Sequence, residues 1–327
     1  MRPRILIAVP PGAPHRSGNR ISASRWARLL GELGYRTRVQ DGWPDTPADC
    51  LLALHARRNA RAVRAFRSAY PDRPLVVVLT GTDVYRDLRT HGGARRALAL
   101  ADRLVVLQPE ALEALPGAVR ARAQVIYQSA RPLQPPPAPR RGCFDVACVG
   151  HLRAVKDPMR AALASRALPV ESRIEVIQAG AAMTPALAAR AERETQANPR
   201  YRWVGSLRPG EARRLIARSR LLVVSSRMEG GANVIVAAVI DGVPVAASHV
   251  SGNIGMLGRD YPGYFEVGDT GALTVLLRRC ECEPGFLRRL QSHCAARRHH
   301  FIESTERERL GALMEPLLGR PCQQPRA

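Results

Sequence analysis

The chain contains a single lysine, and every other residue of the Lys and Arg class is an arginine. Of the 50 Lys and Arg residues, only Lys156 is a lysine. An ammonium is a compact point charge and a guanidinium is a planar fork, so a retained lysine indicates a need for the former. Arg153 and Lys156 follow an apolar strand predicted at 144–150, where a helix is expected to begin. Cations beside a helix N-terminus favour phosphate, although drift is the alternative explanation for a single lysine.

A second candidate site lies in the segment SSRMEGGANV, residues 225–234. Gly230 and Gly231 let backbone amides approach a ligand closely, and the apolar helix expected from Asn233 points its positive end at the same place. Glu229 beside them accepts hydrogen bonds from hydroxyl groups. Amides for a diphosphate next to a carboxylate for sugar hydroxyls describe a nucleotide-sugar pocket. The alternative is a tight glycine turn in which Glu229 caps the helix.

Alternating strands and helices must position these residues. Strands are predicted in two groups, at 5–11, 35–40, 50–56, 74–81, 103–109 and 123–129, and at 144–150, 173–180, 201–205, 220–226, 243–248 and 264–268. A helix is expected at 21–34, with Ser22 as its N-cap. This alternation predicts an α/β fold with parallel sheets covered on both faces. Ligands of such sheets bind beyond the carboxyl ends of strands, which makes Gly205 a candidate pocket residue.

A proline-rich segment divides the chain. Residues 133–142 suit neither a helix nor a strand, and we expect them to form a linker. The predicted domains are therefore an N-terminal domain at 1–132 and a C-terminal domain with terminal helices at 143–318, followed by a flexible tail at 319–327. Two α/β halves on a hinge are expected to face a cleft.

Composition limits the classes of function. The 327 residues, 46% of them hydrophobic, can bury a large core, and the sequence contains neither a membrane-span pattern nor a signal-peptide pattern, so we expect a cytoplasmic protein. The net charge of +22 raises the hypothesis of nucleic-acid binding. Arginine is spread along the chain and aromatic residues make up 5%, so no specific nucleic acid is expected as a partner. The seven scattered cysteines form no metal-binding pattern, and no metal is expected.

The chain resembles a known family. GHLRAVKDP, followed by SSRMEGGAN and GVPVAAS, is similar to the donor-binding domain of retaining family-four glycosyltransferases of the GT-B fold. More narrowly, SGNRISASRWARLL, VLTGTDVYRDL, SGNIGMLG and DYPGYFEVGDT resemble the SenB-like selenosugar synthases of selenoneine biosynthesis. Members of that group transfer a hexose from a UDP-sugar to selenophosphate. The resemblance implies two Rossmann-like domains facing a cleft, with a C-terminal helix able to cross back to the first domain.

The resemblance assigns donor-binding roles by position. Arg153 and Lys156 correspond to the pair that holds the diphosphate, and His151 stands where the broader family usually has arginine. Glu229 corresponds to the first glutamate of the family's E-x7-E motif. The loop around the hexose corresponds to Gly230, Gly231, Ala232 and Asn233.

Ala237 stands where the motif has its second glutamate, the expected ligand of the ribose hydroxyls. Loss of a charged hydrogen-bond acceptor costs about 1.5–3 kcal/mol of binding, which is about ten- to a hundredfold in affinity. Three interpretations stay open from the sequence: donor binding is weakened, a group such as Asp241 compensates, or the residue has been replaced.

The first half is expected to bind the acceptor. The turn after its first strand offers His15, Gly18, Asn19 and Arg20, and Arg25 follows one helical turn later. Selenophosphate is a small anion that needs cationic and amide donors, and Arg20 supported by Arg25 is the predicted clamp. Ordinary solvated arginines on a first helix are the alternative.

Thr82 and Asp83 form a second acceptor-side candidate, at the end of the apolar strand 74–81. Asp83 there can orient a base or a sugar hydroxyl, or it can cap the next helix.

The expected reaction follows from the charges. Negative charge gathers on the departing UDP as the anomeric bond breaks, and Lys156 with Arg153 would stabilise that charge without a metal or another cofactor. The expected partners are UDP-N-acetylglucosamine or UDP-glucose and selenophosphate. The phosphoryl selenosugar formed first must still lose phosphate, and His15 is a candidate helper for that step.

Three other functions are compatible with parts of the sequence. An ordinary hexosyltransferase for a glycan, lipid or small molecule would share the donor half. A sugar-nucleotide epimerase would need acid and base carboxylates in the cleft. A noncatalytic polyanion-binding protein would explain the net charge of +22 without any pocket. The preferred hexose, the stereochemical outcome and the oligomeric state stay open.

Overall fold

The computed structural model of the chain describes residues 2–13 and 17–319, and it divides into two compact units. The first unit combines Met1–Gln128 with Glu303–Ala327, and the second is Ser129–Ile302. These units differ from the predicted domains mainly at the C-terminal end, where the predicted second domain runs on to residue 318.

The first unit is built on a six-stranded parallel sheet of order β2-β1-β3-β4-β5-β6. Its strands are β1 Arg4–Val9, β2 Arg36–Asp41, β3 Cys50–Leu54, β4 Leu75–Leu79, β5 Arg103–Val106 and β6 Ala123–Val125. Its helices are α1 Gly18–Glu32, α2 Ala60–Ala69, α3 Leu88–Thr90, α4 Gly92–Leu100, α5 Glu110–Glu113, α6 Gly117–Arg120 and α14 Glu303–Leu318, with a π-helical turn η1 at Asp83–Asp87. Apolar strands separated by amphipathic helices produce this arrangement, because each face of the sheet must be covered.

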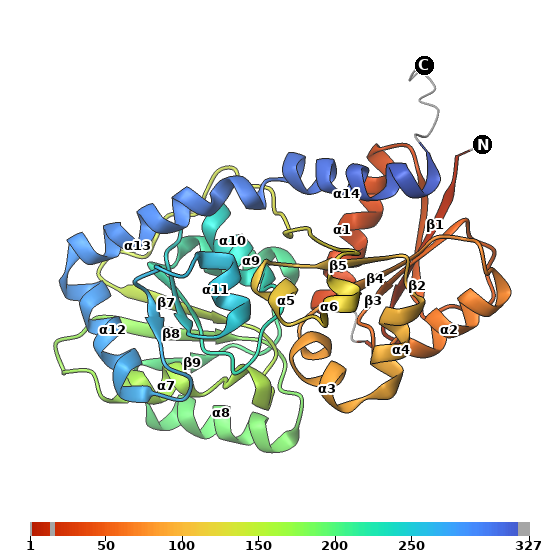
Figure 1. The fold of residues 1–327 in the computed structure, drawn as a ribbon. Helices are drawn as coiled ribbons and strands as arrows, with labels where there is room; N and C mark the ends of the chain where they lie inside the picture. The colour runs from red at the N-terminus through yellow and green to blue at the C-terminus, as the bar shows by residue number, and fades with distance from the viewer. Residues whose placement is uncertain (1, 14–16, 320–327) are drawn as a thin grey trace. The chain divides into compact units, whose positions relative to one another are not determined.

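Two hydrophobic clusters cover the two faces of this sheet. Successive residues of a strand point to opposite faces, so Ile7 of β1 packs in one cluster and Leu6 in the other. The Ile7 cluster includes Trp26 of α1 and Leu310 of α14, and Figure 1 shows these two helices side by side. The Leu6 cluster includes Phe66 of α2. The last helix of the chain is therefore part of the core of the first unit.

The N-cap of the first helix lies five residues before the expected Ser22. Ser17 is the N-cap, and its hydroxyl accepts a hydrogen bond from the Arg20 amide at 3.4 Å. Ser22 lies inside α1 and donates its hydroxyl to the Gly18 carbonyl at 2.9 Å. Two serines compete as caps in this segment, and the earlier one is used because the helix gains a further turn.

The second unit repeats the architecture with a parallel sheet of order β12-β11-β10-β7-β8-β9. Its strands are β7 Phe144–Val149, β8 Ile174–Ala179, β9 Tyr201–Trp203, β10 Leu221–Val224, β11 Val245–Ser248 and β12 Tyr264–Phe265. Its helices are α7 Arg160–Arg166, α8 Pro185–Ala197, α9 Pro209–Arg218, α10 Asn233–Ile240, α11 Ser251–Leu257, α12 Thr270–Cys282 and α13 Pro284–Arg297, with 3-10 turns η2 Ala154–Lys156 and η3 Arg298–Phe301. The predicted α/β class is confirmed, and each predicted strand is present. None of the helices in the described part of the chain is long and apolar enough to cross a membrane.

Candidate functional site

Two loops of the second unit bring the predicted diphosphate and hexose residues together. Lys156 ends η2, which follows β7, and Glu229 lies in the loop that follows β10. Because β7 and β10 are parallel neighbours, both loops leave the same edge of the sheet. The Lys156 ammonium donates a hydrogen bond to Oε1 of Glu229. The two residues that the sequence analysis assigned to different parts of a sugar nucleotide are therefore in direct contact.

Backbone contacts between these loops fix the position of the ammonium. The Ser225 hydroxyl donates to the carbonyls of Lys156 and Asp157 at 3.1 and 2.9 Å. The Arg227 amide donates to the Val155 carbonyl at 2.8 Å. Asp157 has a φ of +43°, in the left-handed region that residues other than glycine seldom adopt. Such a conformation persists only where the surrounding structure holds it, and here the loop contacts do so.

The Glu229 carboxylate is held from two sides. The Ser226 hydroxyl donates to Oε1 at 2.6 Å, and the same oxygen receives the Lys156 bond. Behind the loop, Gly252 of α11 packs so closely that a Cβ there would lie 2.0 Å from the Glu229 carbonyl oxygen. The side chain is 8% exposed, and from the residues that the structure describes its Oε2 accepts no hydrogen bond. Oε2 is the atom that a ligand hydroxyl can reach.

The loop after Glu229 presents backbone rather than long side chains. Gly230 is buried and Gly231 is half-buried. Ala232 is the N-cap of α10 and has no side-chain acceptor for the first amides of the helix, which starts at Asn233. The positive end of α10 thus lies beside the carboxylate, an arrangement that favours a ligand carrying both negative charge and hydroxyl groups.

Asp241 does not compensate for the missing second glutamate. Ala237 is buried on α10. The Asp241 carboxylate accepts from Arg213 Nε at 2.6 Å through Oδ2 and from the Leu133 amide at 3.1 Å through Oδ1. Both oxygens are engaged and the side chain is almost fully buried. Asp241, at the end of α10, therefore binds Leu133 and Arg213 of α9, and it is not available to a ribose.

The remaining donor-side candidates lie at the same edge of the sheet. Gly205 has a φ of +67°, and its carbonyl accepts from the Gly180 amide at 2.7 Å. Gly180 makes room for the loop at His151, because a Cβ there would lie 2.9 Å from the His151 nitrogen. His151 is half-buried, and Arg153 is exposed at the start of the turn that ends in Lys156. The structure thus groups the predicted donor residues along one sheet edge.

Four of the acceptor candidates, Gly18, Asn19, Arg20 and Arg25, lie on α1. Gly18 and Asn19 begin this helix, whereas the sequence placed them in the turn before a helix expected at 21–34. The Arg20 guanidinium donates to the Asp41 carboxylate and, through Nε, to the Ala13 carbonyl at 3.2 Å. Arg20 is therefore paired in this structure, and an acceptor anion would have to compete with Asp41 for it.

Arg25 has a different partner from Arg20. Its Nε donates to Glu306 Oε2 at 2.8 Å, and Trp26 Nε1 donates to Glu306 Oε1 at 2.5 Å. Arg25 is almost buried and Glu306 is fully buried, so this group joins α1 to α14. The predicted support of Arg20 by Arg25 is replaced by this helix-to-helix contact. His15 lies outside the described residues.

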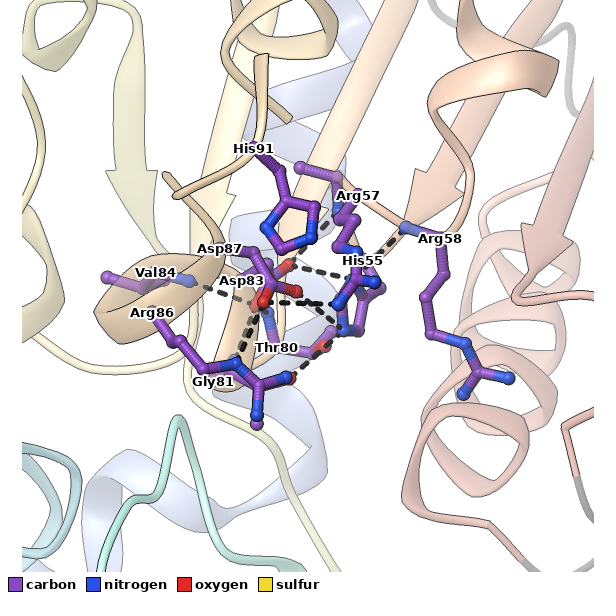
Figure 2. A network of polar contacts seen from close by, with 12 residues as sticks. His55, Arg57, Arg58, Thr80, Gly81, Asp83, Val84, Arg86, Asp87 and His91 are labelled. Atoms are coloured by element: carbon purple, nitrogen blue, oxygen red, sulfur yellow. Dashed lines mark hydrogen bonds and ion pairs between the residues drawn. The ribbon is translucent and has the colours of Figure 1, made fainter. Parts of the chain in front are cut away.

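Asp83 organises the loop after β4, which Figure 2 shows from close by. Its Oδ2 accepts from the Ala56 amide at 3.1 Å. Its Oδ1 accepts at 2.9, 2.7 and 3.2 Å from the backbone amides of Thr80, Gly81 and Val84. These hydrogen bonds fix the conformation of the loop that contains Thr82.

Two residues that the sequence analysis missed complete this network. His55 directly follows β3, and its Nε2 lies 3.1 Å from Thr82 Oγ1 and 3.9 Å from Asp87 Oδ2. Figure 2 shows His55 beside Asp83 and Asp87. Both His55 and Asp87 are buried. A histidine at the carboxyl end of an apolar parallel strand was the available signal for His55. Asp87 becomes noticeable only once the π-helical turn brings it to the histidine.

Comparison with known proteins agrees with this arrangement. Residues 143–278 match the sequence profile of the family described as glycosyl transferases group 1. The matched segment contains Arg153, Lys156, Glu229 and the loop to Asn233. No curated protein sequence matches the chain significantly.

Solved structures show the same fold over nearly the whole chain. HepE of Anabaena in complex with UDP-glucose has a TM-score of 0.74 at 17% identity, covering 97% of this chain and 100% of that one. A sucrose-phosphate synthase from Thermosynechococcus elongatus has a TM-score of 0.78 at 15% identity, covering 97% and 99%. A glycosyltransferase from Rickettsia africae has a TM-score of 0.73 at 12% identity, with the same coverage. The GT-B fold expected from the sequence is confirmed.

Proposed function

We propose that this protein is a UDP-sugar-dependent glycosyltransferase that transfers a hexose to selenophosphate and forms a carbon–selenium bond. The observation that carries the donor half is the contact of Lys156 with Glu229 beside the glycine loop at 230–231. The group 1 glycosyltransferase match over residues 143–278 and the shared fold with HepE, solved with UDP-glucose, support the same donor class. The acceptor rests on the sequence segments that resemble selenosugar synthases.

The side chains have distinct roles in this proposal. Arg153 and Lys156 bind the diphosphate, and Glu229 Oε2 accepts hydrogen bonds from hexose hydroxyls. When the anomeric carbon–oxygen bond breaks, its electron pair leaves with UDP, and the two cations stabilise the charge that develops there. The selenium of selenophosphate supplies the electron pair of the new carbon–selenium bond. Arg20 and the loop at Thr82 are the acceptor-side groups.

Mass spectrometry of the products tests this function. The protein is mixed with UDP-N-acetylglucosamine or UDP-glucose and enzymatically generated selenophosphate, and the products are searched for a hexose with the selenium isotope pattern. Lys156→Ala is expected to lose the product, because removing a charge-stabilising group costs about a hundredfold or more in rate. Arg227→Ala is the matched control, since Arg227 is an exposed cation on the neighbouring loop.

The other outcomes point to other functions. UDP-sugar binding without a selenium product indicates an ordinary hexosyltransferase or a donor site weakened at Ala237. Ala237→Glu separates these two, because a restored ribose ligand would raise donor affinity about ten- to a hundredfold. Salt-sensitive binding to DNA without saturable UDP binding would overturn the proposal in favour of a polyanion-binding protein.

A further inference from the structure

The loops after β3 and β4 bring together the Thr82 hydroxyl, the His55 imidazole and the Asp87 carboxylate. Figure 2 shows the last two. Thr82 Oγ1 lies 3.1 Å from His55 Nε2, and Asp87 Oδ2 lies 3.9 Å from the same nitrogen. Thr82 is half-buried, whereas His55 and Asp87 are buried. The hydroxyl is the member of the group that a substrate can touch, and the other two act through it.

The backbone of both loops is held in unusual conformations. His55 has a φ of +76°, in the left-handed region, although it carries a full side chain. Asp83 is the first residue and Asp87 the last of a π-helical turn. The π-helix is rare, occurs mostly as single turns, and is frequent at functional sites. Both carboxylate oxygens of Asp83 accept hydrogen bonds from backbone amides, so Asp83 maintains the conformation of the loop. The orientation of His55 toward Thr82 follows from this strained framework.

Asp87 has one oxygen without a donor. Its Oδ1 accepts from Arg86 Nε at 3.0 Å and faces the Arg57 guanidinium at 3.5 Å. Its Oδ2 is buried and has no hydrogen-bond partner within residues 2–13 and 17–319. A buried acceptor left without a donor is costly. An imidazolium at His55 would place positive charge beside this oxygen and offset that cost.

In both neutral forms of the His55 ring, a polar group lies near each nitrogen. With the proton on Nε2, that nitrogen donates to Thr82 and Nδ1 faces the Arg58 amide at 3.4 Å. With the proton on Nδ1, Nε2 accepts from the Thr82 hydroxyl and the Asp83 carboxylate lies 3.8 Å from Nδ1. A ring supported in both forms can take a proton from the hydroxyl and give it up again.

Two guanidinium groups flank the relay and favour a phosphoryl ligand. The side chains of Arg57 and Arg86 are 43% and 53% exposed, so each keeps N–H donors that face solvent while it contacts Asp87. Guanidinium groups bind phosphoryl oxygens through paired N–H donors. Both guanidinium groups meet the relay at Asp87, whose other oxygen lies 3.9 Å from the His55 nitrogen that faces Thr82.

We propose that Thr82, His55 and Asp87 form the relay that cleaves the selenium–phosphorus bond of the phosphoryl selenosugar; this inference rests on the proposed function. A water molecule bound to the Thr82 hydroxyl attacks phosphorus, forming an oxygen–phosphorus bond. The phosphorus–selenium bond breaks and its electron pair stays on selenium. The water gives one proton through Thr82 to His55, which passes it to the selenolate through solvent. One water is consumed, and inorganic phosphate and a selenohexose are released without any change of oxidation state.

The ratio of phosphate to UDP released tests this relay in the full-length protein. UDP-glucose and selenophosphate are the substrates, the reaction is quenched early, and phosphate formed without donor is subtracted. The parent is expected to release about one phosphate per UDP. In His55→Gln and Thr82→Val the ratio is expected to fall about tenfold or more, with the phosphorylated selenosugar seen by mass spectrometry. Thr82→Ser, which keeps the hydroxyl, is expected to restore the parent ratio.

The ratio does not depend on the fraction of folded protein, so a destabilised variant still gives an interpretable result. His91→Gln is the matched control, because His91 lies nearby and pairs with the Thr90 hydroxyl instead of Thr82. One phosphate per UDP in His55→Gln would overturn the relay. If the parent releases no UDP in the presence of selenophosphate, the proposed function itself fails, and the relay fails with it.

Discussion

The ammonium of Lys156 and the carboxylate of Glu229 neutralise each other in this structure, although the proposed reaction needs each for a different part of the donor. A diphosphate that recruits Lys156 must break this pair and leaves Glu229 without its cation. A bound UDP-sugar supplies a hexose hydroxyl that donates a hydrogen bond to Glu229, whereas UDP has no hexose. The pair is therefore expected to favour UDP-glucose over the product UDP.

Glu229→Gln should reverse this preference. Release of Lys156 from a partly exposed ion pair, worth about 0.5–1 kcal/mol, is expected to raise the affinity for UDP about two- to fivefold. Loss of a charged acceptor for the hexose should lower the affinity for UDP-glucose about tenfold or more. Isothermal titration calorimetry with both ligands measures the two changes. A parallel loss of both affinities would instead mean that Glu229 only maintains the loop.

Among the elements, α11 shapes the donor loop through one glycine. A Cβ at Gly252 would lie 2.0 Å from the carbonyl oxygen of Glu229, and this neighbour is backbone that cannot rotate away. Gly252→Ala is therefore expected to push the loop at Glu229 out of place and to weaken UDP-glucose binding about tenfold or more. Gly210→Ala in α9 is the matched control, because a Cβ there meets nothing within 4 Å. Equal binding by both variants would contradict the assigned role of α11.

The carboxylate of Glu194 joins α7 to α8, and it predicts that the stability of the protein depends on pH. Burial raises the pKa of Glu194 on α8, but the hydrogen bonds from Arg166 of α7 and from Asn198 outweigh it, so the pKa is lowered. A lowered folded-state pKa contributes stability above the unfolded value, and that stability is lost as the pH falls through the folded value.

Glu194→Gln should therefore reduce the melting temperature near neutral pH. It should also make the decrease of the melting temperature below about pH 4.5 less steep. Arg166 is half exposed, so the loss is expected to be about 1 kcal/mol. Differential scanning calorimetry from pH 3 to pH 7 measures this loss as a change in melting temperature. Glu192→Gln, at an exposed position of the same helix, should leave the pH dependence of the parent unchanged.

For the whole molecule, patterns along the sequence predict the sheets and the donor loop but not the side-chain partners. Apolar runs such as β4 form buried strands in any parallel sheet, and a glycine loop after a strand lies at the ligand edge by topology. The pairing of Arg25 with Glu306 could not be predicted, because it depends on the last helix packing against the first. His55 and Asp87 were missed for a similar reason, since their contact depends on the π-helical turn.

The return of α14 to the first unit predicts that the two ends of the chain stabilise one sheet. Glu306 of α14 is fully buried and accepts from both Arg25 and Trp26, so Glu306→Ala leaves a nearly buried guanidinium without its carboxylate, at a cost of about 3–5 kcal/mol. Hydrogen–deuterium exchange in increasing urea, resolved by peptide, should show the first unit unfolding at lower urea while peptides of 129–302 keep their midpoint. Glu308→Ala, at an exposed position of the same helix, should change neither. An equal shift in both units would mean that α14 stabilises the whole chain rather than the sheet against which it packs.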